Sequence, residues 1–590
     1  MPGLPPKLAG YLPFTDLARC TPRALRQDAL AALTVIFMAV PQGIAYAMIA
    51  GLPPAMGLYA AAIPTIVGAL FRSSRHVITG PTNALSLLVG GALALRLDAD
   101  PVVTAVTLAL MVGLMQVAAG VLGLGALVDF ISAPVVLGYI TGAAVLIGVG
   151  QLDNLTETVV ARGHLLSRLG SWAQGLGEAN HTSMALGLGT AALIVALRRV
   201  DRRLPGAIIA MAVATLLSWA LDLPAHGVSR VLDVHPVPVG LPPISLPDLD
   251  LMQALLPVAV AATVLSLVEA NAVARAIAAH TGQRLRSGAE FAGQGLANLA
   301  AAFFSGYPVS GSLSRSALNH RAGAATRLAG VMSGAAMLAV LLVLGPLVNE
   351  TPIASLAGLL LVVAWDLVDR AQILQTLKAG PSDRLTFLVT LLGTWALPLD
   401  QAIYLGVGLS LVFLLRQVRL LGVRELEVDM KGGLHEVGPL ADTEEDLHRH
   451  TSAVRVLQLE GRLFFGVEGA LRDLLDGVVR DQQVRAVILR LKRAQGMDVT
   501  VARAILEHAH QLRSEGRHML LAGVPVATLH LLERLGVVDA LGREQVFVEH
   551  PNWANSLGAA YRRALELVGG DPAVWEAGDL IAVRERRKQA

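Results

Sequence analysis

The sequence is poor in the residues that mark several common protein classes. It has a single cysteine, Cys20, in 590 residues, so neither an intrachain disulfide nor a cysteine-rich metal site is expected. Aromatic residues make up 4% of the chain and no basic low-complexity tract is present, which leaves nucleic-acid binding without support. We find no nucleophile elbow, phosphate loop or metal-binding histidine spacing, and expect neither an enzyme nor a cofactor.

Charge is also scarce, at 16% of the residues against 54% hydrophobic ones, and the mean hydropathy is +0.59. Soluble proteins carry about a quarter charged residues, so an α-helical polytopic membrane protein is predicted. Residues 28–421 form the predicted membrane domain, with about fourteen membrane segments. The predicted spans are 28–50, 53–71, 82–96, 101–122, 127–152, 181–199, 204–221, 252–278, 288–305, 312–321, 325–348, 353–369, 384–398 and 400–418.

The segment 1–27 has basic residues and no long apolar run, which predicts a cytoplasmic N-terminal segment without a removable signal peptide. After the membrane domain the composition becomes polar, and we expect a linker over 422–452. Strands then alternate with helices over 453–569, which predicts a small α/β domain, and 570–590 is interpreted as a solvated tail. Arginines at the junction indicate that this domain is cytoplasmic.

The stretch Phe303–Arg321 is irregular within an apolar region. Pro308 cannot donate a backbone hydrogen bond, and Gly306 and Gly311 weaken a helix on both sides of it. A helix that begins near Ser312, inside the membrane, presents unpaired N–H groups and the positive end of its dipole. Many transporters hold anions at such helix starts, so this stretch predicts an anion site.

Similar breaks recur in the first half of the membrane domain. Gln42 follows a proline in the first span and lies 40 positions before Thr82, at the start of the short third span. Glu269 lies 41 positions before Ser310, at the start of the short tenth span. Short, interrupted segments at matching positions of two halves indicate a transport site. Seven spans in each half would make the two repeats inverted.

Two long stretches resemble the sulfate permease family, which includes anion exchangers and prestin. They are PQGIAYAMIAGLPPAMGLYAAAIPTIVGALFRSSRHVITGPTNALSLL (Pro41–Leu88) and EFAGQGLANLAAAFFSGYPVSGSLSRSALNHRAGAATRLAG (Glu290–Gly330). The C-terminal domain resembles the sulfate transporter and anti-sigma factor antagonist (STAS) module, with Gly496–Thr500 as its marker. The resemblance implies fourteen segments in 7+7 inverted repeats, a core part that moves against a gate part, and a homodimer in the inner membrane. A cytoplasmic protein that binds the STAS domain is also compatible with the resemblance.

The resemblance further implies a substrate site between the third and tenth spans. The residues expected there are Gln42, Tyr46, Thr82, Asn83, Ser86, Ser310, Gly311, Ser312, Leu313, Ser314 and Arg315. Arg315 offers a planar fork suited to oxyanions, and the alternatives are an arginine that snorkels to the interface or pairs with Glu269. Relatives carry an aromatic residue at the position of Thr82, so the anion selectivity of the site is left open.

Glu269 lies deep in an apolar span, where a carboxylate is costly and is by default functional. The alternative is a permanently protonated structural residue. Relatives with Asp at this position are linked to sodium, and Glu favours protons. We therefore predict proton-coupled symport of an inorganic anion, most of all sulfate, by alternating access. Bicarbonate or a fumarate-like dicarboxylate, sodium-coupled or uncoupled transport, and a membrane scaffold with a partner-binding STAS domain are the alternatives.

Overall fold

The fold is described from a computed structural model of the chain. It describes residues 21–570 apart from the segments 95–98, 125–130, 159, 161–164, 202–203, 235, 344, 419–420, 429–433, 440–452 and 551–552. Residues 1–20 of the predicted N-terminal segment and residues 571–590 of the predicted tail therefore lie outside the described residues, and residues 22–27 belong to a helix. The chain divides into two compact units, residues 1–411 and 412–590, each of which is described by itself.

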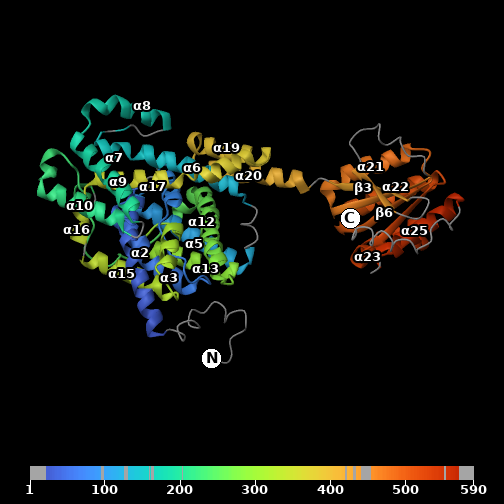
Figure 1. Cartoon of the computed structure of the whole chain (residues 1–590), viewed down its shortest axis with the longest axis horizontal. Coiled ribbons are helices and arrows are strands. Elements are labelled where there is room, and N and C mark those ends of the chain that lie inside the picture. The colour runs from blue at the N-terminus through green and yellow to red at the C-terminus, as the bar shows by residue number, and fades with distance from the viewer. Residues whose placement is uncertain are drawn as a thin grey trace. The chain divides into compact units, whose positions relative to one another are not determined.

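The first unit is helical, and every predicted span contains a helix (Figure 1). Among the described residues, seven helices are long and apolar enough to cross a membrane, and three shorter ones are also apolar. The helices are α2 (Pro22–Ile49), α3 (Pro54–Phe71), α4 (Asn83–Leu93), α5 (Pro101–Val121), α6 (Ala133–Gly150), α7 (Leu152–Thr156), α8 (Leu165–Gly175), α9 (His181–Val200), α10 (Gly206–Ala220), α11 (Val231–Val234), α12 (Met252–Thr281), α13 (Ser287–Phe303), α14 (Leu313–Arg321), α15 (Leu328–Val343), α16 (Gly345–Asn349), α17 (Ile353–Leu367), α18 (Arg370–Lys378), α19 (Pro381–Ala396) and α20 (Leu399–Val418).

Small residues allow the closest helix contacts. A Cβ added at Gly295 of α13 would lie 2.6 Å from the backbone nitrogen of Val117, and one at Gly113 of α5 would lie 2.8 Å from that of Leu299. Such side chains would force α5 and α13 apart, so glycine is required where these backbones meet. Through such contacts α13 packs on α5 and α3, and α15 packs on α3 and α2, while α6, α9, α17 and α19 pack together as a second group.

Two very short strands join the halves of the first unit. β1 (Thr79–Gly80) immediately precedes α4, and β2 (Ser310–Gly311) immediately precedes α14. They pair antiparallel, with Thr79 opposite Gly311 and Gly80 opposite Ser310. The sequence breaks thus become an extended pair whose backbone groups satisfy one another inside the unit, as irregular backbone at membrane depth requires.

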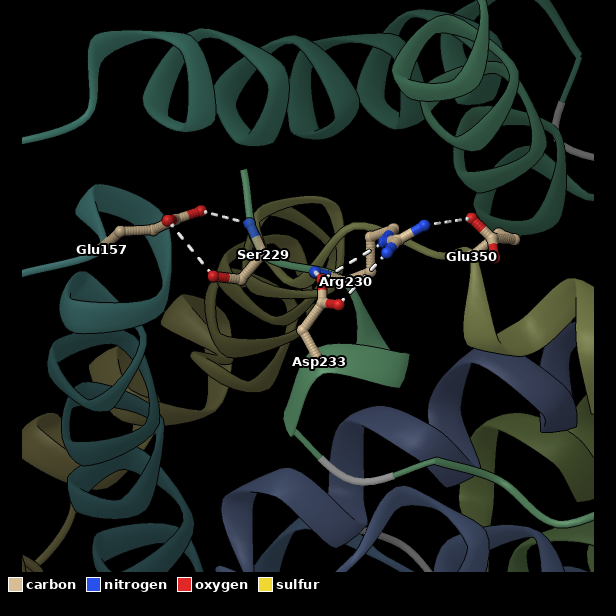
Figure 2. A network of polar contacts seen from close by, with 5 residues as sticks. All are labelled: Glu157, Ser229, Arg230, Asp233 and Glu350. Carbon is tan, nitrogen blue, oxygen red and sulfur yellow. Dashed lines mark hydrogen bonds and ion pairs between the residues drawn. The ribbon is translucent and has the colours of Figure 1, made fainter. Parts of the chain in front are cut away.

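The connector between α10 and α12 is fixed by a polar network (Figure 2). The carboxylate of Glu157 accepts from the backbone nitrogen of Ser229 at 2.9 Å, and Arg230 donates to Asp233 at 3.2 Å and to Glu350 at 2.9 Å. The hydrogen bond from Arg230 lowers the pKa of Asp233. Because these residues come from the C-cap of α7, the connector and the turn between α16 and α17, the network holds three separate segments together.

The second unit is an α/β domain built on a six-stranded sheet (Figure 1). The strand order is β4-β3-β5-β6-β7-β8; β3 runs antiparallel to β4 and β5, and β5 to β8 are parallel. The strands are β3 (Gly422–Val428), β4 (Leu434–Pro439), β5 (Val454–Leu463), β6 (Ala486–Met497), β7 (His518–Val524) and β8 (Val546–Val548). The helices are α21 (Glu468–Arg480), α22 (Val499–Ser514), α23 (Val526–Arg534), α24 (Val537–Leu541) and α25 (Trp553–Val568).

Alternating side chains supply two cores in this domain. Leu457 and Leu459 of β5 pack with Leu471 of α21 on one face of the sheet. Val456 packs with Leu557 of α25 on the other face. Successive side chains of β5 thus point to opposite faces of the sheet, and both faces are covered by helices.

The prediction of a linker over 422–452 is corrected by β3 and β4, which belong to the sheet. A buried ion pair explains the misleading polarity of β3: the Glu425 carboxylate accepts from Arg455 of β5, with the two side chains 8% and 3% exposed. The helix α21 was not predicted either. Residues 440–452 of the expected linker lie outside the described residues.

Candidate functional site

The candidate site is built where the two short strands lead into helices. Thr82 and Ser312 occupy the N-cap positions of α4 and α14 with extended backbone, yet neither side chain caps its helix. The first N–H groups of α14 therefore keep the partial positive charge of a helix start, whereas in α4 the Ala84 N–H donates to the side chain of Asn83. Since β1 and β2 are paired, these two helix starts lie close to each other.

Glu269 of α12 reaches the start of α4. Its Oε2 accepts a hydrogen bond from the Thr82 hydroxyl at 3.1 Å, and the residue is only partly buried. The helix α12 also contacts β2 directly one turn earlier: the Ser310 hydroxyl donates to the Ser266 carbonyl at 3.0 Å, and the Ser266 hydroxyl donates to the Val309 carbonyl at 3.1 Å. A single helix thus supplies the carboxylate and holds the strand of the opposite half.

Arg315 of α14 points across the pair of strands. It is 1% exposed, and its Nη2 donates to the Pro81 carbonyl at 2.5 Å. A Cβ at Gly80 would lie 2.6 Å from its Nη1, so glycine makes room for the guanidinium. Neither the snorkelling nor the pairing alternative fits, because the residue is buried and, within the described part of the chain, forms no ion pair with Glu269.

The face of α14 that begins the helix is open. Leu313 is 61% exposed, Ser314 is exposed, and the Ser314 hydroxyl lies 3.4 Å from that of the buried Ser312. The two hydroxyls therefore lie together at the first turn of α14, and Arg315 follows in the same turn. Such neutral donors beside one buried cation suit an oxyanion.

Gln42 and Tyr46 lie on the buried side of α2. Both residues are 6% exposed, and the Oε1 of Gln42 accepts no hydrogen bond from the described residues. The helix α2 packs against α14, which carries Arg315. Gln42 and Tyr46 therefore lie on a helix that contacts α14, although they precede Arg315 by some 270 positions of sequence.

Other expected residues lie behind the site. Ser86 is fully buried and hydrogen-bonds the Tyr307 hydroxyl at 3.1 Å, and Asn83 accepts from the backbone of Ala84. Gly311 packs on Ala270 of α12. These residues support the helix starts instead of presenting donors to the open face.

Two tyrosines were missed by sequence reasoning. Tyr307 bonds Ser86, and Tyr139 of α6 donates to the Ala84 carbonyl at 3.2 Å, so both brace the first turn of α4. Tyr307 precedes the conspicuous Pro308, which is a signal that could have drawn attention to it. Tyr139 lies in an apolar span with no such signal, and only the packing brings it near.

Comparisons with known proteins show the family and the domains that this chain resembles. The sequence profile of the sulfate permease family matches residues 25–390, and that of the STAS domain matches residues 447–550. The chain is 31% identical to the protein named probable sulfate transporter MT1781 of Mycobacterium tuberculosis, over 92% of this chain and 96% of that protein. It is 27% identical to the chloroplastic sulfate transporter 4.1 of Arabidopsis thaliana, over 88% and 78%.

Solved structures show the same fold. The inward-facing murine solute carrier 26 family member A9 superposes with a TM-score of 0.84 at 19% identity, covering 96% of both chains. The transmembrane domain of the cyanobacterial bicarbonate transporter BicA superposes with a TM-score of 0.57 at 23% identity, covering 67% of this chain and 98% of that one.

Proposed function

Because the chain belongs to the sulfate permease family, a family of anion transporters, we propose that it carries sulfate across the membrane together with protons. One observation supports this most directly. Two helix starts follow the paired strands β1 and β2, and the carboxylate of Glu269 is hydrogen-bonded at one of them. The anion-binding groups and the only expected proton carrier thus belong to one site.

Sulfate would be held by the start of α14. Its oxygens would accept from first-turn amides and from the hydroxyls of Ser312 and Ser314. Arg315 would supply positive charge from its buried position behind them. A divalent oxyanion gains from several fixed donors because each charge-assisted hydrogen bond is stronger than a neutral one.

Coupling would arise because like charges repel. Sulfate next to ionised Glu269 is disfavoured, so anion binding and protonation of the carboxylate favour each other, and the effect is reciprocal. The Thr82 hydroxyl can donate to the carboxylate or accept from the carboxyl group. Glu269 therefore keeps its partner in both protonation states, which suits a residue that must load and release a proton.

Alternating access would move the helix group around α3, α5 and α13 against the group around α6, α9 and α17. In keeping with the basic junctions, the N-terminus and the STAS domain are proposed to be cytoplasmic, with the transporter in the inner membrane as a homodimer. The STAS domain remains the candidate surface for a cytoplasmic partner.

The test is transport by purified protein in liposomes under an inward proton gradient. We expect gradient-driven accumulation of labelled sulfate, and parallel assays with bicarbonate and fumarate, with or without a sodium gradient, identify the preferred ion pair. No gradient-driven accumulation of any anion would refute symport.

Substitution of the carboxylate tests its role. Glu269→Gln keeps the size and the hydrogen-bonding ability but cannot change its charge, so uptake should lose its dependence on the proton gradient. Glu178→Gln, at an exposed position, is the matched control and should behave as the wild type. Persistent coupling in the Glu269→Gln variant would show that another group carries the proton.

A further inference from the structure

One face of α13 carries a stripe of buried polar side chains. Glu290, Gln294 and Asn298 follow one another at intervals of four residues, so they lie on the same side of the helix. They are 2%, 0% and 0% exposed, in a helix whose other buried residues are small or apolar. Polar groups at membrane depth are costly unless they are hydrogen-bonded, so such a stripe indicates a specific task.

Two residues of this stripe bind the backbone of Val309, which directly precedes β2. Asn298 contacts both polar groups of that residue: its Oδ1 accepts from the Val309 nitrogen at 2.7 Å, and its Nδ2 donates to the Val309 carbonyl at 3.1 Å. Gln294 donates from Nε2 to the same carbonyl at 2.6 Å. The pairing of β2 with β1 begins only at Ser310, so these side chains supply the partners that a longer strand would provide.

The two amides are themselves held by neighbouring helices. Gln116 of α5 is 0% exposed, and its Oε1 accepts from Nδ2 of Asn298 at 2.8 Å. Arg72, at the end of α3, donates to Oε1 of Gln294, so that the Nε2 of this amide faces Val309. Each amide is thereby held in one orientation, as a precise support requires.

The two sides of the strand pair are supported differently. Before β1, the Ile78 nitrogen donates to the Ser316 hydroxyl at 2.9 Å, and the Ile78 carbonyl accepts from the Ser312 nitrogen at 2.9 Å. Both partners belong to α14 or to its N-cap. Before β2, by contrast, Val309 is held by side chains of α12 and α13. The β1 side is thus tied to α14, whereas the β2 side is anchored to α13, which carries no residue of the anion site.

We propose that Gln294 and Asn298 are positioning residues of the anion site. By holding Val309 they fix β2, and they thereby set where the amides and hydroxyls at the start of α14 lie. Their amides are engaged at the backbone, so they act through it and do not touch the anion. This inference rests on the proposed sulfate site at Ser312 and Ser314. Several donors suit one oxyanion only while their spacing is maintained.

The test compares two variants of similar side-chain volume in liposomes. Asn298→Leu and Gln294→Met remove the amides, so the sulfate concentration at half-maximal uptake should rise at least about threefold. The rise should be larger for Asn298→Leu, which loses both bonds to Val309. A merely structural residue would change the amount of folded transporter, and hence the maximal rate, at an unchanged half-maximal concentration. Hydrogen exchange of β2 and of the first turn of α14, measured by mass spectrometry on the same preparations, should become faster.

Asn349 provides a matched control because it makes the same pair of hydrogen bonds elsewhere. Its Oδ1 accepts from the Val237 nitrogen at 2.7 Å, and its Nδ2 donates to the Val237 carbonyl at 3.1 Å. Asn349→Leu should accelerate hydrogen exchange in the connector around Val237. It should leave the sulfate concentration at half-maximal uptake and the exchange of β2 unchanged.

The outcomes separate this inference from the proposed function. A wild type that accumulates no anion refutes the transport proposal, and the hydrogen exchange of β2 then decides whether the two amides hold that strand. Half-maximal concentrations equal to the wild-type value in both well-folded variants would overturn the positioning role. An equal rise of that concentration in Asn349→Leu, or unchanged exchange of β2 in both variants, would overturn it as well.

Discussion

Gln42 is buried in α2 with an amide oxygen that accepts no hydrogen bond from the described residues. An unsatisfied buried acceptor costs about 1–3 kcal/mol. We predict that Gln42→Leu raises the thermal unfolding temperature and lowers the rate of sulfate uptake. Functional sites often trade stability for activity in this way. Thermal unfolding and liposome uptake of the same preparation check both effects, and a fall in both would show that the residue is structural.

Arg315 should contribute to anion affinity through both its charge and its shape. Loss of one hydrogen bond to a charged group costs about 1.5–3 kcal/mol, which is roughly tenfold or more in affinity. Arg315→Gln should therefore raise the sulfate concentration at half-maximal uptake at least about tenfold. Arg315→Lys keeps the charge but lacks the planar fork. Its sulfate concentration at half-maximal uptake should therefore lie between those of the wild type and of Arg315→Gln. If the values for both variants equal that of the wild type, Arg315 has only a structural role.

Two further elements, α3 and β1, depend on a small residue between them. A Cβ at Gly68 of α3 would lie 2.4 Å from the Thr79 hydroxyl and 2.9 Å from its Cβ, and the neighbouring Thr65 hydroxyl donates to the Thr79 carbonyl at 2.6 Å. We predict that Gly68→Ala displaces β1 and reduces sulfate uptake several-fold.

The control is a glycine with free space around it. A Cβ at Gly189 of α9 meets nothing within 4 Å, and an alanine in a helix is favoured by about 0.5–1 kcal/mol. Gly189→Ala should therefore leave uptake intact and not lower the unfolding temperature. Equal loss of uptake in both variants would contradict a specific role for the contact between α3 and β1.

At the scale of the whole molecule, two compact units predict two thermal transitions by calorimetry. Glu425→Ala leaves Arg455 buried without its partner, which costs about 3–5 kcal/mol. We expect this change to lower the transition temperature of the second unit and to leave that of the first unit unchanged. Glu566→Gln removes a carboxylate from an exposed pair with Arg563. It should change the free energy of unfolding of neither unit by more than about 1 kcal/mol. A joint shift of both transitions would mean that the units unfold together.

The sequence predicted the helices well because long apolar segments in a membrane have few alternatives. It also predicted both helix starts, since proline and glycine are conspicuous in an apolar background, and Glu269 stands out there as a lone carboxylate. The pairing of β1 with β2 could not be predicted, because two residues carry no periodicity. The direction of the Arg315 side chain and the contact of Tyr139 with α4 depend on tertiary packing. The strand β3 was mistaken for a linker because the charge of Glu425 is compensated by Arg455, which is distant in the sequence.

The antiparallel pair of β1 and β2 has a consequence for biosynthesis. Thr79 and Gly80 obtain their partners from residues about 230 positions later in the chain. Until the ribosome has delivered that second half, the first half must shelter unpaired backbone groups that lipid cannot satisfy. The nascent chain therefore gains from staying beside the insertion machinery until both halves are present, and a transporter cut between them would mature only if the two pieces were made together.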